Sequence, residues 1–412
     1  MLSHRVGLLY WYKDGVNAGT MNTDRFRWDR LTYASALGYA LLVCGLSVGV
    51  VLGELRHQFH LSGVIAALHG STFGFASISA GLFGVRVVDR LGRRTSLAMA
   101  AAALATGIMM FCLGPAWPIT LAGTALAGLG GALLVMVMPG LISDHHGDHR
   151  AAAFAAVNGA PGLAGVTFSL VVGAALALHW SWRPPYLIVT AVIAVALVKV
   201  AWPVSIPESP RQVDFTLAWL RDRDVFVPWL HIVNAVFTEF AVGVWAATYL
   251  KEVGHASGGQ AAALAGVFGV TMFLSRHFLP TTMRFFGENT VTVSFAVLTV
   301  GALVMCFAPG LLPRVGGLIL VGLGGAPLYP LTVDRLYASA EHKIDSISLG
   351  AICILASGTA VTLGPLTLGV LADSVGLRLA LLIVPAVGVI GAITQRPARA
   401  LRPAHTIAPA LD

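Results

Sequence analysis

One carboxylate, that of Glu239, lies near the middle of a long apolar segment of this 412-residue chain. An ionisable group at that depth costs free energy, so such a residue by default indicates function rather than packing. Arg276 and His277 lie within the next apolar segment. We expect Arg276 to neutralise Glu239 or to bind an anionic group of a substrate; the alternative is that its side chain extends to the nearer end of the segment. A carboxylate in this setting is suited to carrying a proton.

Polar and aromatic side chains follow Glu239 along its segment. Five of them share one helical face, with Glu239 on its flank: His231, Asn234, Thr238, Trp245 and Tyr249. Such a face is typical of a helix that lines a water-filled cavity, so we expect these residues to border the path of a substrate or a proton. The alternative is hydrogen bonding between helices. For His69, in another apolar segment, we expect hydrogen-bonded packing, with a place on the same path as the alternative.

The composition places these segments in a lipid bilayer. Hydrophobic residues make up 57% of the chain, charged residues only 11%, and the mean hydropathy is +0.80. Soluble globular proteins carry about 25% charged residues. The net charge of +7 is spread along the chain rather than gathered in one patch, which argues against nucleic acid as a partner. The four cysteines each stand alone in an apolar run and form no metal-ligand spacing, so we expect neither a metal site nor a cofactor.

Apolar runs of about 20 residues, the length that crosses the hydrocarbon core, define the expected elements. They predict an all-α membrane protein with twelve spans, at 31–53, 63–84, 95–114, 118–143, 151–178, 184–203, 226–250, 260–283, 291–309, 315–337, 346–372 and 378–395.

Basic residues predict the orientation of these spans. Counted with the N-terminus inside, the inner segments hold 19 of the 26 lysines and arginines. Because inner loops of membrane proteins are enriched in these residues, we expect both termini in the cytoplasm and the chain in the plasma membrane.

Two short sequences recur 194 residues apart. Val-Gly-Val stands at 48–50 and again at 242–244, and Gly-Leu-Gly-Gly-Ala at 128–132 and again at 322–326. These matches predict two parallel six-helix halves, 31–203 and 226–395, around a central cavity. The remaining parts are an N-terminal segment 1–30, a linker 204–225 and a tail 396–412, all expected in the cytoplasm.

The segment between the second and third spans is unusually charged. It reads Val85-Arg-Val-Val-Asp-Arg-Leu-Gly-Arg-Arg94, and it resembles the loop that joins helices 2 and 3 in the major facilitator superfamily, commonly Gly-x-x-x-Asp-Arg-x-Gly-Arg-Arg/Lys. The match comprises Asp89, Arg90, Gly92, Arg93 and Arg94, whereas Val85 replaces the first glycine.

The resemblance implies a conformational latch between the two halves. Asp89 can accept hydrogen bonds from the exposed N–H groups of a neighbouring helix, and the arginines can pair with carboxylates or lipid phosphates. Asp144, at the end of the fourth span, is a further expected partner. By this resemblance, the contacts hold the outward-facing state and break as the protein turns inward. The alternative is a solvated basic loop.

The resemblance further implies a secondary active transporter rather than an enzyme. We expect it to move a small organic solute by alternating access, coupled to protons as a symporter or antiporter, and to work as a monomer. One alternative is a multidrug/proton antiporter, although Thr124 stands where such proteins often carry an arginine. The other is a non-transporting receptor or scaffold on the same fold.

Overall fold

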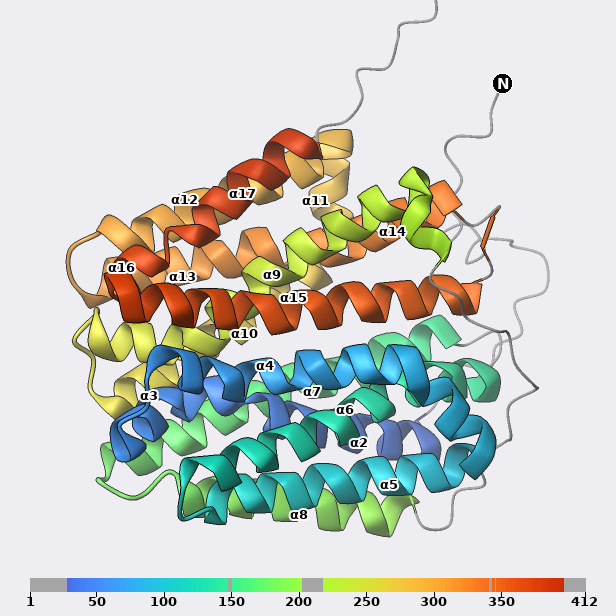
Figure 1. Cartoon of the computed structure of the whole chain (residues 1–412), viewed down its shortest axis with the longest axis horizontal. Helices are drawn as coiled ribbons and strands as arrows, with labels where there is room; N and C mark the ends of the chain where they lie inside the picture. Colours follow the sequence, from blue (N-terminus) through green and yellow to red (C-terminus); the bar gives the residue numbers. More distant parts are fainter. Residues whose placement is uncertain (1–27, 147–149, 202–217, 341–342, 345, 396–412) are drawn as a thin grey trace, which may run out of the picture.

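The computed structural model describes residues 28–146, 150–201, 218–340, 343–344 and 346–395, and within these ranges every regular element is helical. Twelve helical segments are long and apolar enough to cross a membrane, as the sequence predicts. They run along the long axis of one bundle (Figure 1), and residues 28 and 395 lie at the same end of it. We call this the terminal end and the opposite one the distal end. Most of the expected N-terminal segment, most of the linker and the whole tail fall outside the described residues.

The first six spans form one half of the bundle. A break at Ser47 divides the first span in two, and the second span ends in a π-helical turn, Ala80–Gly84. The helices are α2 (Arg30–Leu46), α3 (Val48–Phe59), α4 (Gly63–Ser79), α5 (Val85–Leu113), α6 (Trp117–His146), α7 (Arg150–Ala177) and α8 (Arg183–Ala201).

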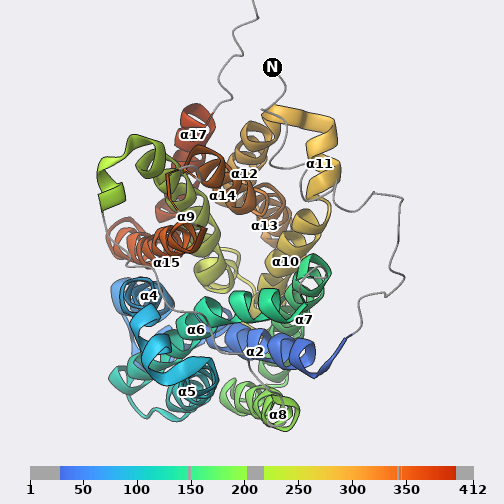
Figure 2. The ribbon, with the colours of Figure 1, turned by 90° about the vertical axis from the view of Figure 1, so that its right-hand side faces the viewer.

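The other six spans form the second half, after a short 3-10 turn at Ala218–Arg221. The helices are α9 (Arg223–Glu252), α10 (Gly258–His277), α11 (Leu279–Phe286), α12 (Thr290–Phe307), α13 (Leu311–Gly325), α14 (Leu328–Ala340), α15 (Ser346–Val375), α16 (Leu377–Ala380) and α17 (Ile383–Thr394). Seen from the terminal end, this half lies on one side of the bundle and α2 to α8 on the other (Figure 2). The tenth span breaks at Ala326, directly before Pro327, which lacks the N–H that would continue the helix.

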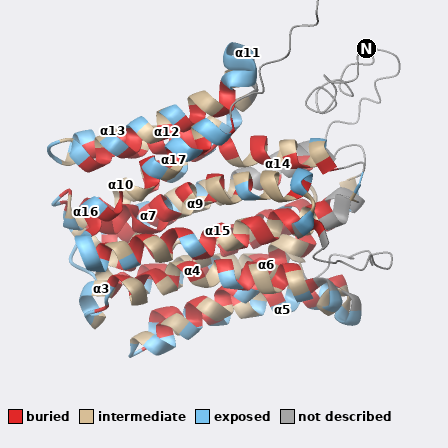
Figure 3. Ribbon diagram, turned by 45° about the horizontal axis from the view of Figure 1, so that its top comes forward, coloured by how far each residue is buried: buried red, intermediate tan, exposed pale blue. Residues whose placement is uncertain are grey.

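The eighth span ends earlier than the sequence analysis expected. It stops at His277 rather than at 283, and the exposed helix α11 follows after Phe278 (Figure 3). Pro280 explains the difference, because proline is tolerated in the first turn of a helix but not in its interior. Arg276 therefore lies in the last turn of α10, closer to the helix end than the expected span 260–283 implied.

Glycines bring helices of one half together, and the same contacts recur in the other half. A Cβ on Gly107 of α5 would lie 2.5 Å from the carbonyl oxygen of Gly123 in α6. A Cβ on Gly301 of α12 would lie 2.7 Å from the carbonyl oxygen of Gly317 in α13, and both residues are 194 positions further along the chain. Small residues at both positions allow the backbones to approach this closely.

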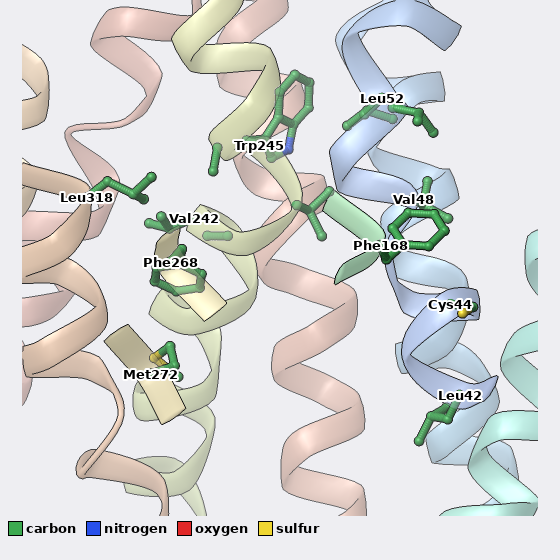
Figure 4. Close-up of a cluster of buried hydrophobic side chains, with 14 of the residues drawn as sticks. Leu42, Cys44, Val48, Leu52, Phe168, Val242, Trp245, Phe268, Met272 and Leu318 are labelled. Atoms are coloured by element: carbon green, nitrogen blue, oxygen red, sulfur yellow. The ribbon is translucent and has the colours of Figure 1, made fainter. Parts of the chain in front are cut away.

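The two halves also meet through glycine pairs, four of which join Gly49 with Gly243, Gly63 with Gly369, Gly74 with Gly358 and Gly173 with Gly259. The first of these pairs lies between α3 and α9, the next two between α4 and α15, and the last between α7 and α10. Figure 2 shows α4 beside α15 and α7 beside α10. Apolar packing continues across this boundary (Figure 4), where Val48 and Phe168 of one half belong to the same buried cluster as Val242 and Phe268 of the other.

Candidate functional site

Glu239 and Arg276 form an ion pair between α9 and α10. The Arg276 Nη2 atom donates to both carboxylate oxygens of Glu239, at 2.9 and 3.1 Å, and its Nε donates to the carbonyl oxygen of Ala326 at 3.3 Å. That carbonyl lies at the break between α13 and α14, where carbonyl oxygens at the end of α13 lack the backbone N–H partners of a continuous helix. The exposed fraction is 18% for the Glu239 side chain and 43% for that of Arg276. The pair is thus held by three helices of one half and still reaches solvent.

Trp245 and Tyr249 are packed between helices in this structure, and their expected place on the path of a substrate stays a prediction. Both are fully buried in the second half. The Trp245 Nε1 atom donates to the Pro365 carbonyl of α15 at 3.0 Å, and the Tyr249 hydroxyl donates to the Met305 carbonyl of α12 at 2.6 Å. Arg314 completes this arrangement by donating to the Tyr249 hydroxyl at 2.9 Å. Each polar atom has a partner on a neighbouring helix, so this part of the face serves helix packing.

The remaining members of the face are fully or half buried. Thr238 is fully buried and donates to the carbonyl oxygen of Ala235 within its own helix. Asn234 is half-buried, and its Nδ2 atom donates to the Val387 carbonyl of α17 at 3.1 Å. His231, one turn earlier, is also half-buried. Among these residues Asn234 bonds to another helix, as the alternative reading expects, and the side chain of Glu239 on the flank of the face is 18% exposed.

His69 is a packing residue in this structure. Its side chain is 1% exposed, with Nδ1 at 2.9 Å from the Ile65 carbonyl oxygen and Nε2 at 2.9 Å from the Thr120 hydroxyl. A small cavity of about 20 Å³ between the halves is bordered by His69 and Thr124 on one side and by Phe240 of α9 on the other. Because both ring nitrogens have partners, His69 fixes α4 against α6.

A group of charged residues joins the two halves at the distal end. Arg56 of α3 donates from Nη1 to both carboxylate oxygens of Glu252 in α9, each at 3.1 Å. Glu54 of α3 pairs with Lys251 of α9. Nothing in the order of residues reveals this group, because its partners are 196 or 197 positions apart.

Asp373, near the end of α15, belongs to the same group and closes another helix end. Its carboxylate accepts hydrogen bonds from the backbone N–H groups of Gly63 and Val64 at the start of α4, at 2.5 and 3.0 Å. Arg56 approaches it to 3.8 Å. A negative charge at a helix N-terminus satisfies unpaired N–H groups and complements the helix dipole. We call Glu54, Arg56, Lys251, Glu252 and Asp373 the distal charge cluster.

The charged loop that resembles the superfamily motif lies at the terminal end. Gly92 has φ 75° and ψ 159°, a backbone conformation that glycine adopts without strain and that lets the chain kink inside α5, between residues 85–91 and 93–113. Arg93 is buried, whereas Arg90 and Arg94 are exposed. The side chains of Asp89 and Asp144 lie outside the described residues, so the expected latch contacts remain a prediction.

Other charged groups at the terminal end pair within one half. The Nε2 atom of His145 lies 2.5 Å from the Asp29 carboxylate, which caps α2 by accepting from the Thr32 backbone at 2.8 Å. His146 lies beside the same threonine, with Nε2 at 3.1 Å from its hydroxyl. The ligand atoms of Asp29, His145 and His146 all lie within 4.8 Å of one another, a grouping that could hold a metal ion. In the second half, Lys343 pairs with Asp222 and Asp224.

Asp29 should make the stability of the protein sensitive to acid. Partial burial raises its pKa, but the hydrogen bonds from Thr32 and His145 outweigh this effect and hold the pKa at about 2, below the ordinary 3.8. The folded state therefore gains stability above about pH 4 that is lost as the pH falls towards 2. We expect the loss to be at most about 1 kcal/mol, because the side chain is over a third exposed. Thermal unfolding of wild type and of Asp29→Asn, measured between pH 4 and pH 2, tests this contribution of Asp29. Equal losses of stability in the two proteins would contradict it.

Comparison with known proteins decides the family. The sequence profile described as Major Facilitator Superfamily matches residues 35–348. The chain belongs to this superfamily. It is a transporter of the superfamily's type rather than an enzyme, and the twelve spans and the charged loop agree with this membership.

Relatives and solved structures give the fold but not the solute. The chain is 27% identical over 106 residues to a protein named probable polyol transporter 4 from Arabidopsis thaliana, and 30% identical over 142 residues to the uncharacterized transporter y4wD of Sinorhizobium fredii. The first match covers 25% of this chain and 20% of its relative, and the second covers 34% of this chain and 37% of its relative. The chain therefore matches well under half of the length of either relative.

Among solved structures, a mutant of the nucleoside transporter NupG superposes with a TM-score of 0.73 at 12% identity, covering 89% of this chain and 98% of that one. A D-xylose-proton symporter superposes with a TM-score of 0.71 at 18% identity, covering 89% and 96%. At these identities, the likeness establishes the shared fold alone.

Proposed function

We propose that the protein is a secondary active transporter that moves a small organic solute across the plasma membrane by alternating access, coupled to protons. The distal charge cluster carries this proposal. It holds the two halves together at one end through ion pairs and a helix cap, contacts that can break without disturbing the packing inside either half. Two halves that rock about a central site need such a reversible closure at each end.

Coupling to protons rests on Glu239 and Arg276. The carboxylate either stays charged against the guanidinium or takes up a proton and releases it, and its exposed fraction lets protons and solute reach it. The Arg276 side chain is 43% exposed, so water reaches the pair from the side of the guanidinium.

The names of the relatives suggest the first solutes to test: polyols, pentoses and nucleosides. The purified protein in liposomes should accumulate at least one of them when a pH gradient is imposed, and a protonophore should abolish the accumulation. Uptake no greater than that of protein-free liposomes for the whole panel, extended to amphipathic drugs, would contradict the proposal.

In the membrane we place both termini in the cytoplasm, because the loops at the terminal end hold most of the lysines and arginines. The distal charge cluster then closes the outside. The halves 31–203 and 226–395 are the moving units, and a single chain suffices for the cycle.

Asp89, with Arg90, Gly92, Arg93 and Arg94, is proposed to close the cytoplasmic end as Asp373 closes the distal one. Asp89→Asn should cut transport about tenfold or more, because a charge-assisted hydrogen bond contributes roughly 1.5–3 kcal/mol. Its thermal unfolding should stay near that of wild type. Arg86→Gln, which changes an exposed charge outside the motif, is the matched control. Undiminished transport by Asp89→Asn would reduce the loop to a determinant of topology.

A further inference from the structure

An aliphatic cavity lies inside the first half, and neither Glu239 nor Arg276 lines it. It has a volume of about 400 Å³ and is enclosed by α2, α5, α6 and α8, which Figure 2 shows grouped on one side of the bundle. Its lining is almost entirely aliphatic, mostly alanine and leucine. The lining contains one charged residue, Arg94, and one hydroxyl residue, Ser35. All four helices belong to the same half, so this space is separate from the boundary at which the proposed solute site lies.

The cavity is a trench that runs from the terminal end to the middle of the bundle. On α2 its lining extends from Leu31 to Leu41, and on α5 from Arg94 to Ala105. At a rise of 1.5 Å per residue, these stretches are about 15 Å long. The hydrocarbon core of a bilayer is about 30 Å thick, so the trench is about as deep as one leaflet. Arg94 stands at its mouth, where the headgroups of that leaflet lie.

Ser35 supplies an independent sign of a ligand. Its side chain is fully buried and lines the trench one helical turn below Leu31, and its hydroxyl has no hydrogen-bond partner among the described residues. A buried hydroxyl without a partner costs free energy. An acceptor placed just below the headgroup level would remove this cost, and the ester carbonyl of a glycerolipid occupies that depth.

We propose that this trench binds one acyl chain of an anionic phospholipid. The chain fills the aliphatic trench, the Ser35 hydroxyl donates to the ester carbonyl, and the lipid phosphate pairs with Arg94. Basic side chains at the cytoplasmic ends of membrane helices favour anionic headgroups in this way. A free phosphate would use Arg94 alone and leave the trench empty, and a zwitterionic lipid would bring its own cation to the same arginine.

Native mass spectrometry of the full-length protein in detergent tests this proposal. We expect wild type to retain one dioleoyl phosphatidylglycerol at concentrations where dioleoyl phosphatidylcholine is retained about tenfold less, the effect of about one charge-assisted contact. Ala101→Phe, which fills the trench, should reduce retention of both lipids. Arg94→Gln should remove the preference for phosphatidylglycerol and keep the retention of phosphatidylcholine.

Two matched variants control for general effects of these changes. Met99→Phe adds an aromatic ring to the exposed face of α5 outside the trench, and Arg86→Gln removes an exposed charge from the start of α5, outside the trench and the proposed latch. Both should bind phosphatidylglycerol as wild type does. Equal retention of the two lipids by wild type, or unchanged retention by Ala101→Phe, would overturn the proposal.

Thermal unfolding separates the lipid from a free anion and guards against misfolded variants. Phosphatidylglycerol should raise the unfolding temperature of wild type and of Met99→Phe, but not that of Ala101→Phe, because a ligand stabilises the state that binds it. Inorganic phosphate at the same concentration should change none of them. Stabilisation of wild type by phosphate alone would show an anion site rather than a lipid site.

Discussion

Glu239→Gln should abolish solute transport driven by a pH gradient and leave solute exchange without a gradient largely intact. Glutamine has nearly the shape of glutamate and can still accept a hydrogen bond from Arg276, but it cannot take up a proton. The carrier should therefore still change between its two orientations with solute bound, while the link between proton and solute movement is lost. Uptake and counterflow in the same liposomes measure the two processes side by side.

Two further variants show whether the effect belongs to the ion pair. Glu288→Gln removes an exposed carboxylate that takes no part in the ion pair, and it should transport as wild type does. Arg276→Ala alone leaves Glu239 without its partner, and the double variant should be no worse than the more impaired single variant, because residues that act as a unit have non-additive effects. Gradient-driven uptake of wild-type magnitude by Glu239→Gln would make the pair a packing feature and place proton coupling elsewhere.

Asp373→Asn should open the distal end more often. The change removes the negative charge that caps α4 and lies near Arg56, and each charge-assisted contact contributes roughly 1.5–3 kcal/mol. The side chain is 30% exposed, so the lower part of that range applies and corresponds to about a tenfold shift in a two-state equilibrium. A cysteine at Thr248, which is fully buried beside Gly53 of the other half, reports the opening.

The measurement is the rate at which a membrane-impermeant maleimide labels Thr248→Cys. In the Asp373→Asn background, we expect labelling about tenfold faster than in the wild-type background. Glu288→Gln combined with Thr248→Cys should leave the labelling rate as it is in Thr248→Cys alone. Equal rates with and without Asp373 would mean that the carboxylate does not hold the distal end closed.

The sequence predicts the membrane-spanning architecture well, because hydropathy and loop charge are local properties. Every one of the twelve apolar runs corresponds to a helical span. The pairing of Glu239 with Arg276 was also predictable, since the helices that carry them are consecutive and two ionisable groups in apolar surroundings stabilise one another. Pro280 is a local signal that α10 ends before it, and it outweighs the apolar residues that continue beyond His277.

Other features depend on the assembled bundle. A polar face such as that of Trp245 and Tyr249 suits a cavity wall and a helix interface equally well, and only the neighbours, here the carbonyl groups of Pro365 and Met305, decide between them. The distal charge cluster brings together residues that are more than 190 positions apart, so its ion pairs carry no local signal. From the sequence, Asp373 is a loop residue just after an apolar run. Its role as the cap of α4 follows only from the contact between α4 and α15 in the bundle.

A cysteine pair at Gly53 and Thr248 tests alternating access most directly. A Cβ on Gly53 would lie 3.6 Å from the Thr248 Cα, and 3.4 Å from its Oγ1, so Gly53→Cys with Thr248→Cys can form a disulfide between the halves while the distal end is closed. The four native cysteines are buried, and each single variant controls for their oxidation. Oxidation of the double variant should stop transport of the solute identified in liposomes, and reduction should restore it. Transport at the full rate by protein that is completely cross-linked would contradict the account.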